Sequence, residues 1–440
     1  MRTSGNVVLF AFATVATACA ATSDVHPFGT GSGGAQGGAS PGSPGSTTGT
    51  GQGGGLAFDA GAGPGADCVV TDMNADMDGD GWTPAQGDCN DCDPNVNPGA
   101  IDTVTQGPNG PILGNEDCAG KPGTVPGPCD DNLAVDDADP LDAARAVELC
   151  TPLTDPRKWG LKSAKWVLPD GSDPATLTPA YEATMAQATA NFPLGHGLLA
   201  AFGSNVAVRA GKRMLGLSSG TARQPSDPGY LDVNGFNKMY TSGSPVGFPK
   251  AAPACPGVTT GQPHDGIALE VELVAPTNAK GFSFSFNFFT YEWPDFICST
   301  FNDVFVALRM PFPAGQTDGN ISFDSLGNPV SVNNAFLEVC GCAPSAPPCP
   351  AGGKSFTCAL GDTQLAGTGF GADTAGADHA STYWLQTKAP VSPHEDFTLR
   401  WAVYDSSDGE LDTTTLIDDF QWIATPGDVA VGTTPADVPK

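Results

Sequence analysis

The chain has 440 residues, a formal net charge of −29, 57 glycines and 40 prolines. This length exceeds that of one ordinary domain, and so strong an acidic excess argues against any nucleic-acid partner. The acidic residues are also unevenly spread: residues 67–142 hold 17 Asp and Glu against the single Lys121, so this segment repels itself unless cations neutralise it.

The amino end is typical of an export signal. Arg2 precedes an apolar run over residues 7–15, and Cys19 stands where a lipoprotein signal places the cysteine that receives a lipid. We therefore expect residues 1–19 to be a signal peptide and the mature protein to be held by its lipid at the cell surface or outer membrane. Cleavage after Ala20 followed by simple secretion is the alternative. No later segment is long and apolar enough to span a bilayer.

Residues 20–66 are rich in Gly, Ser and Pro, and no charged residue occurs between Phe28 and Asp59. Such a composition cannot bury a core and predicts a disordered, flexible linker. With a root-mean-square span of roughly 35 Å, the linker would hold folded modules away from a membrane.

The thirteen cysteines form an odd count for an exported chain, but setting Cys19 aside leaves two sets of six. The first set is Cys68, Cys89, Cys92, Cys118, Cys129 and Cys150, and the second is Cys255, Cys298, Cys340, Cys342, Cys349 and Cys358. We expect disulfides to close two modules, with the pairing open and one bridge between the sets as an alternative. Zinc is not expected, because neither set offers two Cys or His pairs at ligand spacing.

A string of the form D-x-D-x-D-G runs over residues 76–81, and it can supply three oxygen ligands from one tight turn. The twelfth position is Gly87, where an EF-hand has a bidentate Glu, so carboxylates further along must complete the ligand shell. The expected Ca²⁺ ligands are Asp76, Asp78, Asp80, Asp88, Asp91 and Asp93. We therefore expect residues 67–150 to be an Asp- and Cys-rich metal-binding module; an acidic solvated loop is the alternative.

The stretch DMDGDGWTPAQGDCNDCDPNVNPGA, residues 76–100, resembles the Asp-rich metal-binding motif of secreted bacterial proteins, which is related to thrombospondin type 3 repeats. The pattern of that motif is D-x-D-G-D-G, a spacer, and D-C-D-D-x-D-P-x-V-x-P-G-A. The chain departs from it at Asn90, where the pattern prefers Asp, and at Cys92, where the pattern varies. The resemblance implies calcium binding by the aspartates.

Two short helices are expected next. Residues 141–150 are rich in helix-forming Ala and Leu. A second helix is expected to begin at Thr178, whose hydroxyl can cap it, with Pro179 in the first turn. Residues 151–192 are accordingly expected to form a helical connector.

Beyond residue 192 the apolar period changes to two. Apolar residues alternate with polar or small ones over 267–273 and 282–288, and the runs 304–308, 336–339 and 397–403 continue this pattern. Such runs, separated by turn residues, predict half-buried antiparallel strands. The predicted fold is therefore mainly β: an antiparallel β-sandwich over residues 193–426, followed by a flexible tail over 427–440.

The stretch FSFNFFTYEWPDFICSTFNDVFVALRM, residues 284–310, resembles the bacterial choice-of-anchor L domain, and weaker likeness extends over 193–426. The matching positions are Glu292, Pro294, Asp295, Phe296, Phe301, Asn302, Asp303, Val304 and Phe305. Tyr291 replaces a Glu of the family pattern, so one expected carboxylate is missing. Residues 325–334 and 399–422 resemble later segments of the family. The resemblance implies an exported β-domain without known enzymatic activity.

Two further acidic groups could hold a second calcium ion between strands. One group is the turn with Asp405, Asp408 and Asp412, and the other is Glu292, Asp295 and Asp303. The alternative is that these residues serve only the turns, because Asp and Asn there accept hydrogen bonds from their own backbone.

No catalytic site is expected. Residues 216–220 match G-x-S-x-G around Ser218, but the strand–turn–helix context that a nucleophile elbow requires is absent from the pattern. None of the five histidines forms an H-E-x-x-H pair. A glycosidase would need two carboxylates across a cleft, which sequence cannot place.

These observations predict a non-enzymatic, calcium-dependent surface lipoprotein that acts in adhesion or in contact with a matrix glycan or protein. The alternative is a secreted carbohydrate-active enzyme or glycan-binding protein, in which Trp293, Trp384 and Trp401 would stack on sugars. A purely structural coat protein is a third class.

Overall fold

The computed structural model describes residues 68–107, 110–120, 127–333, 336–340, 349–351, 353–371 and 379–436. All of them belong to one compact unit, residues 58–440. The predicted signal peptide, the lipidation site Cys19, the linker and Cys342 lie outside the described residues.

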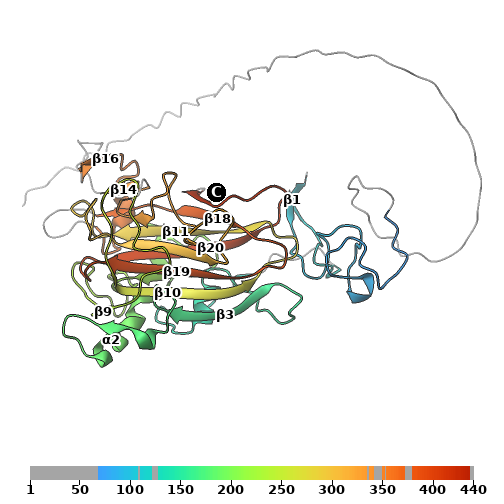
Figure 1. The fold of residues 1–440 in the computed structure, drawn as a ribbon, viewed down its shortest axis with the longest axis horizontal. Coiled ribbons are helices and arrows are strands. Elements are labelled where there is room, and N and C mark those ends of the chain that lie inside the picture. The colour runs from blue at the N-terminus through green and yellow to red at the C-terminus, as the bar shows by residue number, and fades with distance from the viewer. Residues whose placement is uncertain are drawn as a thin grey trace, which may run out of the picture. The chain divides into compact units, whose positions relative to one another are not determined.

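The described chain is mainly β, and its larger sheets are antiparallel, as predicted (Figure 1). The seven-stranded sheet has the order β13 (Val330–Ser331), β12 (Val304–Met310), β19 (Asp396–Ser406), β10 (Pro263–Val274), β9 (Tyr240–Thr241) and β4 (Thr178–Pro179), with β3 (Gly160–Val167) also paired to β10. The eight-stranded sheet has the order β14 (Val339–Cys340), β17 (Ala380–Ser381), β11 (Gly281–Thr290), β20 (Thr413–Ile423), β8 (Met214–Ser218) and β5 (His196–Leu199), with β18 (Leu385–Pro390) on β11 and β21 (Gly432–Pro435) on β18.

The remaining elements are short. Three hairpins pair β1 (Val104–Gly107) with β2 (Gly110–Leu113), β6 (Ala201–Phe202) with β7 (Val206–Ala207), and β15 (Cys349–Ala351) with β16 (Lys354–Phe356). The α-helices are α1 (Pro140–Arg145) and α2 (Met185–Asn191), and the 3-10 turns are η1 (Pro84–Gln86), η2 (Pro174–Thr176), η3 (Phe192–Gly195) and η4 (Thr363–Leu365).

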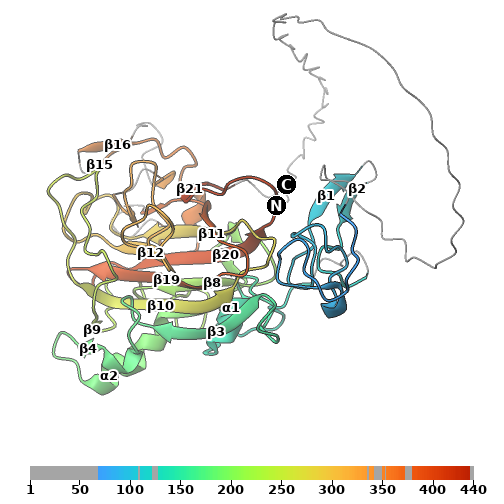
Figure 2. The ribbon, with the colours of Figure 1, turned by 45° about the vertical axis from the view of Figure 1, so that its right-hand side comes forward.

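The two large sheets lie face to face (Figure 2), and aromatic side chains fill the space between them. Phe284 of β11 meets Trp401 of β19 edge to face, with ring centroids 5.5 Å apart. The ring centroids of Phe286 of β11 and Phe305 of β12 lie 4.8 Å apart. Because β11 belongs to one sheet and β12 and β19 to the other, these ring pairs form the interior of a sandwich. Each such pair contributes about 0.5–1.5 kcal/mol beyond the burial of its area.

Both faces of β11 are buried, so the prediction of half-buried strands is wrong for this strand. The polar residues Ser285 and Asn287 are as inaccessible as the phenylalanines between them. Phe289, on the same outer face, packs in a second apolar cluster that includes Leu365 of η4 and Phe370. Loops outside the sheet therefore cover the face that the alternating pattern assigned to solvent.

The helices differ from the prediction. Helix α1 ends at Arg145, so the helix expected over residues 141–150 is too long, and Glu148 within that range has a φ of 68°, which an α-helix does not contain. Helix α2 begins after Thr184, whose side chain forms a capping box with Gln187, and not after Thr178. The expected start at Thr178 is wrong because Thr178 pairs with β9 as part of β4.

The segment expected as a helical connector, residues 151–192, contributes a full strand to the sandwich. Strand β3 pairs with β10 from Ala268↔Val167 to Val274↔Gly160. Its burial follows no clean alternation, which is why the period did not reveal it. Part of the expected tail is ordered as well, since β21 pairs with β18.

Ten of the predicted cysteines form five disulfides: Cys68–Cys92, Cys89–Cys118, Cys129–Cys150, Cys255–Cys298 and Cys340–Cys358. Each of these bridges stays within one of the two sets. The Cα–Cα distances of 5.2–5.9 Å are ordinary for disulfides. Such a framework is consistent with an extracellular protein.

Candidate metal centre

The Asp-rich loop is folded by aspartate side chains that accept hydrogen bonds from its own backbone. The two oxygens of Asp76 accept from the N–H groups of Gly79, at 2.7 Å, and Gly81, at 2.9 Å. These glycines have φ values of 80° and 91°, in the left-handed region that other residues rarely adopt. The alternation of Asp and Gly thus bends the chain around a small interior.

The second acidic stretch folds back onto this turn. The Asp91 Oδ1 accepts a hydrogen bond of 2.8 Å from the N–H of Met77. On either side of Asp91, the Cys89–Cys118 and Cys68–Cys92 bridges fix the returning chain. A loop with few apolar residues of its own therefore gains its shape from cross-links and side-chain hydrogen bonds.

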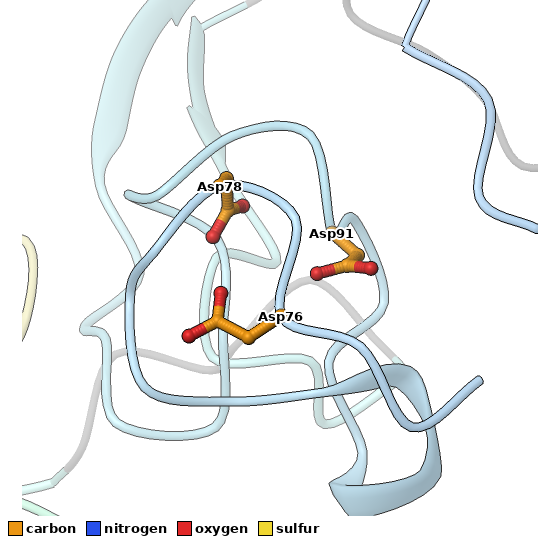
Figure 3. A group of neighbouring side chains, drawn as sticks. All are labelled: Asp76, Asp78 and Asp91. Atoms are coloured by element: carbon orange, nitrogen blue, oxygen red, sulfur yellow. The ribbon is translucent and has the colours of Figure 1, made fainter. Parts of the chain in front are cut away.

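Five of the six predicted ligands meet in two groups that share Asp78. The groups are Asp76, Asp78 and Asp91, shown in Figure 3, and Asp78, Asp80 and Asp88. In each group, one carboxylate oxygen per residue lies within 4.8 Å of the others. Oxygens at about 2.3–2.6 Å from a common Ca²⁺ ion have such separations. Either group could therefore hold a metal ion.

Asp93 belongs to neither group. Its Oδ1 instead accepts hydrogen bonds from the backbone N–H and the side-chain amide of Asn95. The structure thus gives the sixth predicted ligand a turn-forming role, and it stands apart from the other five.

Four carboxylate oxygens in the loop lack any hydrogen-bond partner although solvent does not reach them. They are the Oδ2 atoms of Asp78, Asp80, Asp88 and Asp91. A buried anionic oxygen without a donor is costly, by about 1–3 kcal/mol or more for a charged group. One such atom from each of four neighbouring aspartates is the arrangement that a bound cation would satisfy.

The electrostatics of the loop agree with this geometry. Burial, aided by the charge of Asp80, raises the pKa of Asp78 to about 7. Burial also raises the pKa of Asp88 to about 6 and shifts the pKa of Asp80 upward. Burial and the neighbouring carboxylates therefore oppose the ionisation of these aspartates, and a bound cation would favour it. The donors are all oxygens, since the nearby cysteines are in disulfides, and such a set favours a hard cation.

The two further acidic groups in the sequence come together in part. Glu292, Asp303, Asp405 and Asp412 are buried at the ends of neighbouring strands, whereas Asp295 is exposed and Asp408 is half-buried. Sequence reasoning missed Asp265 and Lys238, which join the same cluster. No local pattern marks these two residues.

The three tryptophans expected to stack on sugars in the glycan-binding alternative are not accessible to a ligand. Trp293, Trp384 and Trp401 are all buried, with at most 5% of their surface exposed. Ser218 is equally inaccessible, lies in the antiparallel strand β8, and donates to the carbonyl of Thr413. A buried hydroxyl in this setting is not a nucleophile elbow.

Comparisons with protein-family models, curated proteins and solved structures find no match. Within the described ranges, no helix has both the length and the apolar character to cross a membrane.

Proposed function

We propose that this protein is an exported, lipid-anchored cell-surface protein whose Asp-rich loop binds Ca²⁺, and that its role is adhesion or contact with a matrix glycan or protein without enzymatic activity. The four orphaned oxygens of Asp78, Asp80, Asp88 and Asp91 carry the calcium part of this proposal. Ca²⁺ is preferred over Mg²⁺ because it accepts many carboxylates in irregular geometry, whereas Mg²⁺ demands a near-ideal octahedron and keeps several waters.

The surface role rests on different support. The disulfide framework suits an oxidising compartment, and the lipoprotein-like signal and Gly-rich linker would place the folded part away from a membrane. The resemblance to choice-of-anchor L domains supports a β-domain presented at a surface. Calcium would then act by fixing the shape of the disulfide-rich module next to the sandwich.

The test is thermal unfolding of the full chain, exported to an oxidising compartment, in chelator and then in millimolar Ca²⁺. At a hundredfold excess over Kd, binding stabilises by about 2.7 kcal/mol, which for a folded unit the size of residues 58–440 raises Tm by about 3–4 °C. Replacing Asp78 and Asp80 by Asn should reduce the rise, because both metal-binding groups of the loop then lose ligands.

Two controls sharpen the result. Asp93→Asn changes the same charge in the same loop but leaves both groups intact, so its response to Ca²⁺ should equal that of the wild type. Mg²⁺ at equal concentration should give a smaller rise. An unchanged Tm in Ca²⁺ would mean that the loop is only a solvated acidic cluster, and the calcium proposal would be wrong.

A further inference from the structure

A second set of carboxyl groups lies between the two sheets at one end of the sandwich. Four strand ends converge there: Glu292 follows β11, Asp303 precedes β12, Asp405 lies near the end of β19, and Asp412 precedes β20. Asp265 enters from β10, where the pairing with β19 shifts register between His264 and Ile267. All five carboxyl groups are buried, with at most 2% of each residue exposed.

Hydrogen bonds tie part of this cluster to the strand ends. The Glu292 Oε2 accepts from the N–H of Asp303 at 2.9 Å, and the Asp303 Oδ2 accepts from the Thr413 hydroxyl at 2.6 Å. The carboxyl group of Asp303 lies beside those of both Glu292 and Asp405. The cluster is thus continuous across the two sheets.

The cluster has fewer positively charged groups facing it than it has carboxyl groups. Lys238 is fully buried, and its Nζ donates to the carbonyl of Ser218 at 2.8 Å. Asp265 is the best partnered acid, since it accepts from the N–H groups of Lys238 and Tyr240. Lys238 can balance one carboxylate, so the other four have no matching cation among the described residues.

Asp405 and Asp412 are the least satisfied of these acids. Both oxygens of each side chain are inaccessible to solvent; those of Asp412 lack a hydrogen-bond partner, and Asp405 lies near only the Ser219 hydroxyl and the Asp303 carboxyl group, neither in good hydrogen-bond geometry. The Asp412 carboxylate also lies so close to Gly220 that a Cβ at that position would overlap it. Gly220 therefore makes room for a carboxylate that the surrounding protein does not neutralise.

We propose that this cluster is a second site for a hard divalent cation, separate from the Asp-rich loop, with Asp405 and Asp412 as its principal ligands. Among the described residues, only the two groups of the loop bring three carboxylate oxygens within 4.8 Å of one another, so a cation in this cluster must take further ligands from backbone carbonyls and hydroxyls. Ca²⁺ accepts such mixed oxygen shells.

Protonation is the competing way to neutralise the cluster. Burial raises the pKa of Glu292, Asp303, Asp405 and Asp412 well above the usual range, and their mutual repulsion adds to the rise for Asp303, Asp405 and Asp412. The charged and titratable groups that face Asp405 are Asp303 before β12, Asp265 of β10, Asp412 before β20, Glu292 after β11, Tyr240 of β9 and Lys238. A cation and protons would compete for the same oxygens, so calcium counting separates the two.

The experiment counts calcium in the full chain after equilibration with millimolar Ca²⁺ at pH 8 and removal of loose ions by gel filtration. The Asp78→Asn, Asp80→Asn variant removes the loop site and should keep one calcium per chain. Adding Asp405→Asn and Asp412→Asn should remove that ion. Glu410→Gln, in the same turn but exposed, should leave it in place.

Thermal unfolding of the same variants shows whether they fold. Asn at positions 405 and 412 removes buried charge without changing volume, so in chelator these variants should unfold no earlier than their parent. A folded loop variant that holds no calcium at pH 8 would overturn the second site. In that case protons alone neutralise the cluster. A wild-type Tm that rises with Ca²⁺ would still support the loop site.

Discussion

At the scale of single residues, Glu148 and Asp418 form a buried pair of carboxyl groups that shares a proton. Its Oε2 accepts from the N–H of Asp419 at 2.8 Å, and its carboxyl group lies against that of Asp418. The Asp418 Oδ2 in turn accepts from the N–H of Arg209 at 2.6 Å. Burial and the neighbouring carboxyl group raise the pKa of Glu148, and burial raises that of Asp418. The pair therefore retains a proton in the folded state at neutral pH.

The sign of the resulting pH dependence follows from linkage. The unfolded chain releases this proton above its ordinary pKa of about 4.5, whereas the folded chain holds it to higher pH. The pair's contribution to the free energy of unfolding is therefore greatest below about pH 4.5 and falls as pH rises. Glu148→Gln cannot ionise and its amide can donate to Asp418, so Tm at pH 8 should rise and the decline between pH 5 and pH 8 should shrink.

Each unit of pKa shift is worth about 1.4 kcal/mol, so the gain in Tm at pH 8 should be a few degrees. Glu182→Gln, at an exposed position, is the matched control and should unfold as the wild type does. Unfolding scans at pH 5, 6.5 and 8 measure both effects. A Glu148→Gln protein that melts below the wild type at pH 8 would contradict the shared proton.

At the scale of elements, disulfides fix the shape of the Asp-rich loop that forms the proposed calcium site. Between residues 72 and 93 only Trp82 contributes a buried apolar side chain. The Cys89–Cys118 bridge joins this stretch to the chain after β2 across 29 residues. Closing a chain of this length is worth about 3–4 kcal/mol by the entropy of the unfolded chain. Without the bridge, part of that ordering must come from calcium binding.

We therefore expect replacement of Cys89 and Cys118 by Ser to raise the calcium Kd at least tenfold, since each 1.4 kcal/mol lost is a factor of ten. Titration calorimetry measures the change directly. Replacing the Cys340–Cys358 pair, which lies in the other set, should leave Kd unchanged. Equal affinity in the two variants would show that the loop is ordered without its bridge.

The elements that the sequence predicted well are those with local patterns. The Asp and Gly spacing of residues 76–81 places ligands within one turn, and strict alternation identified β10 and β11. What failed depended on distant partners: Thr178 has the features of a helix cap but pairs with β9, and β3 has no clean period. Lys238 joins the buried cluster only through the fold, so no local pattern could have marked it.

At the scale of the whole molecule, hydrogen bonds join the Asp- and Cys-rich module to the sandwich. This contact, which we call the seam, is formed by Asn97 and Ile101 of the module and Thr277 and Asn278 of the sandwich. The side-chain amide of Asn278 donates to the carbonyl of Ile101 at 2.8 Å, and its oxygen accepts from the N–H of Ile101 at 3.0 Å. The Thr277 hydroxyl donates to the Asn97 Oδ1 at 2.7 Å. The Asn97 side chain also lies beside Asp80, where it offsets part of the rise that burial causes in the pKa of that carboxyl group. Asp80, a proposed calcium ligand, is thus two side chains away from the sandwich.

Because buried hydrogen bonds of this kind are worth about 1–3 kcal/mol when a partner is left unsatisfied, the seam should couple the two parts in unfolding. In a protein that carries Asp405→Asn and Asp412→Asn, and so lacks the second proposed site, we expect Ca²⁺ to protect amide hydrogens of β10 and β11 from exchange as well as those of the loop. Thr277→Val with Asn278→Ala should confine the protection to the loop while calcium affinity changes little. Asn205→Ala removes a hydrogen bond to Thr363 far along the chain from the module and should leave the protection of β10 and β11 intact. Protection that reaches both strands equally in the seam variant would mean that calcium bound in the loop acts on the sandwich by another route, and the seam would not couple the two parts.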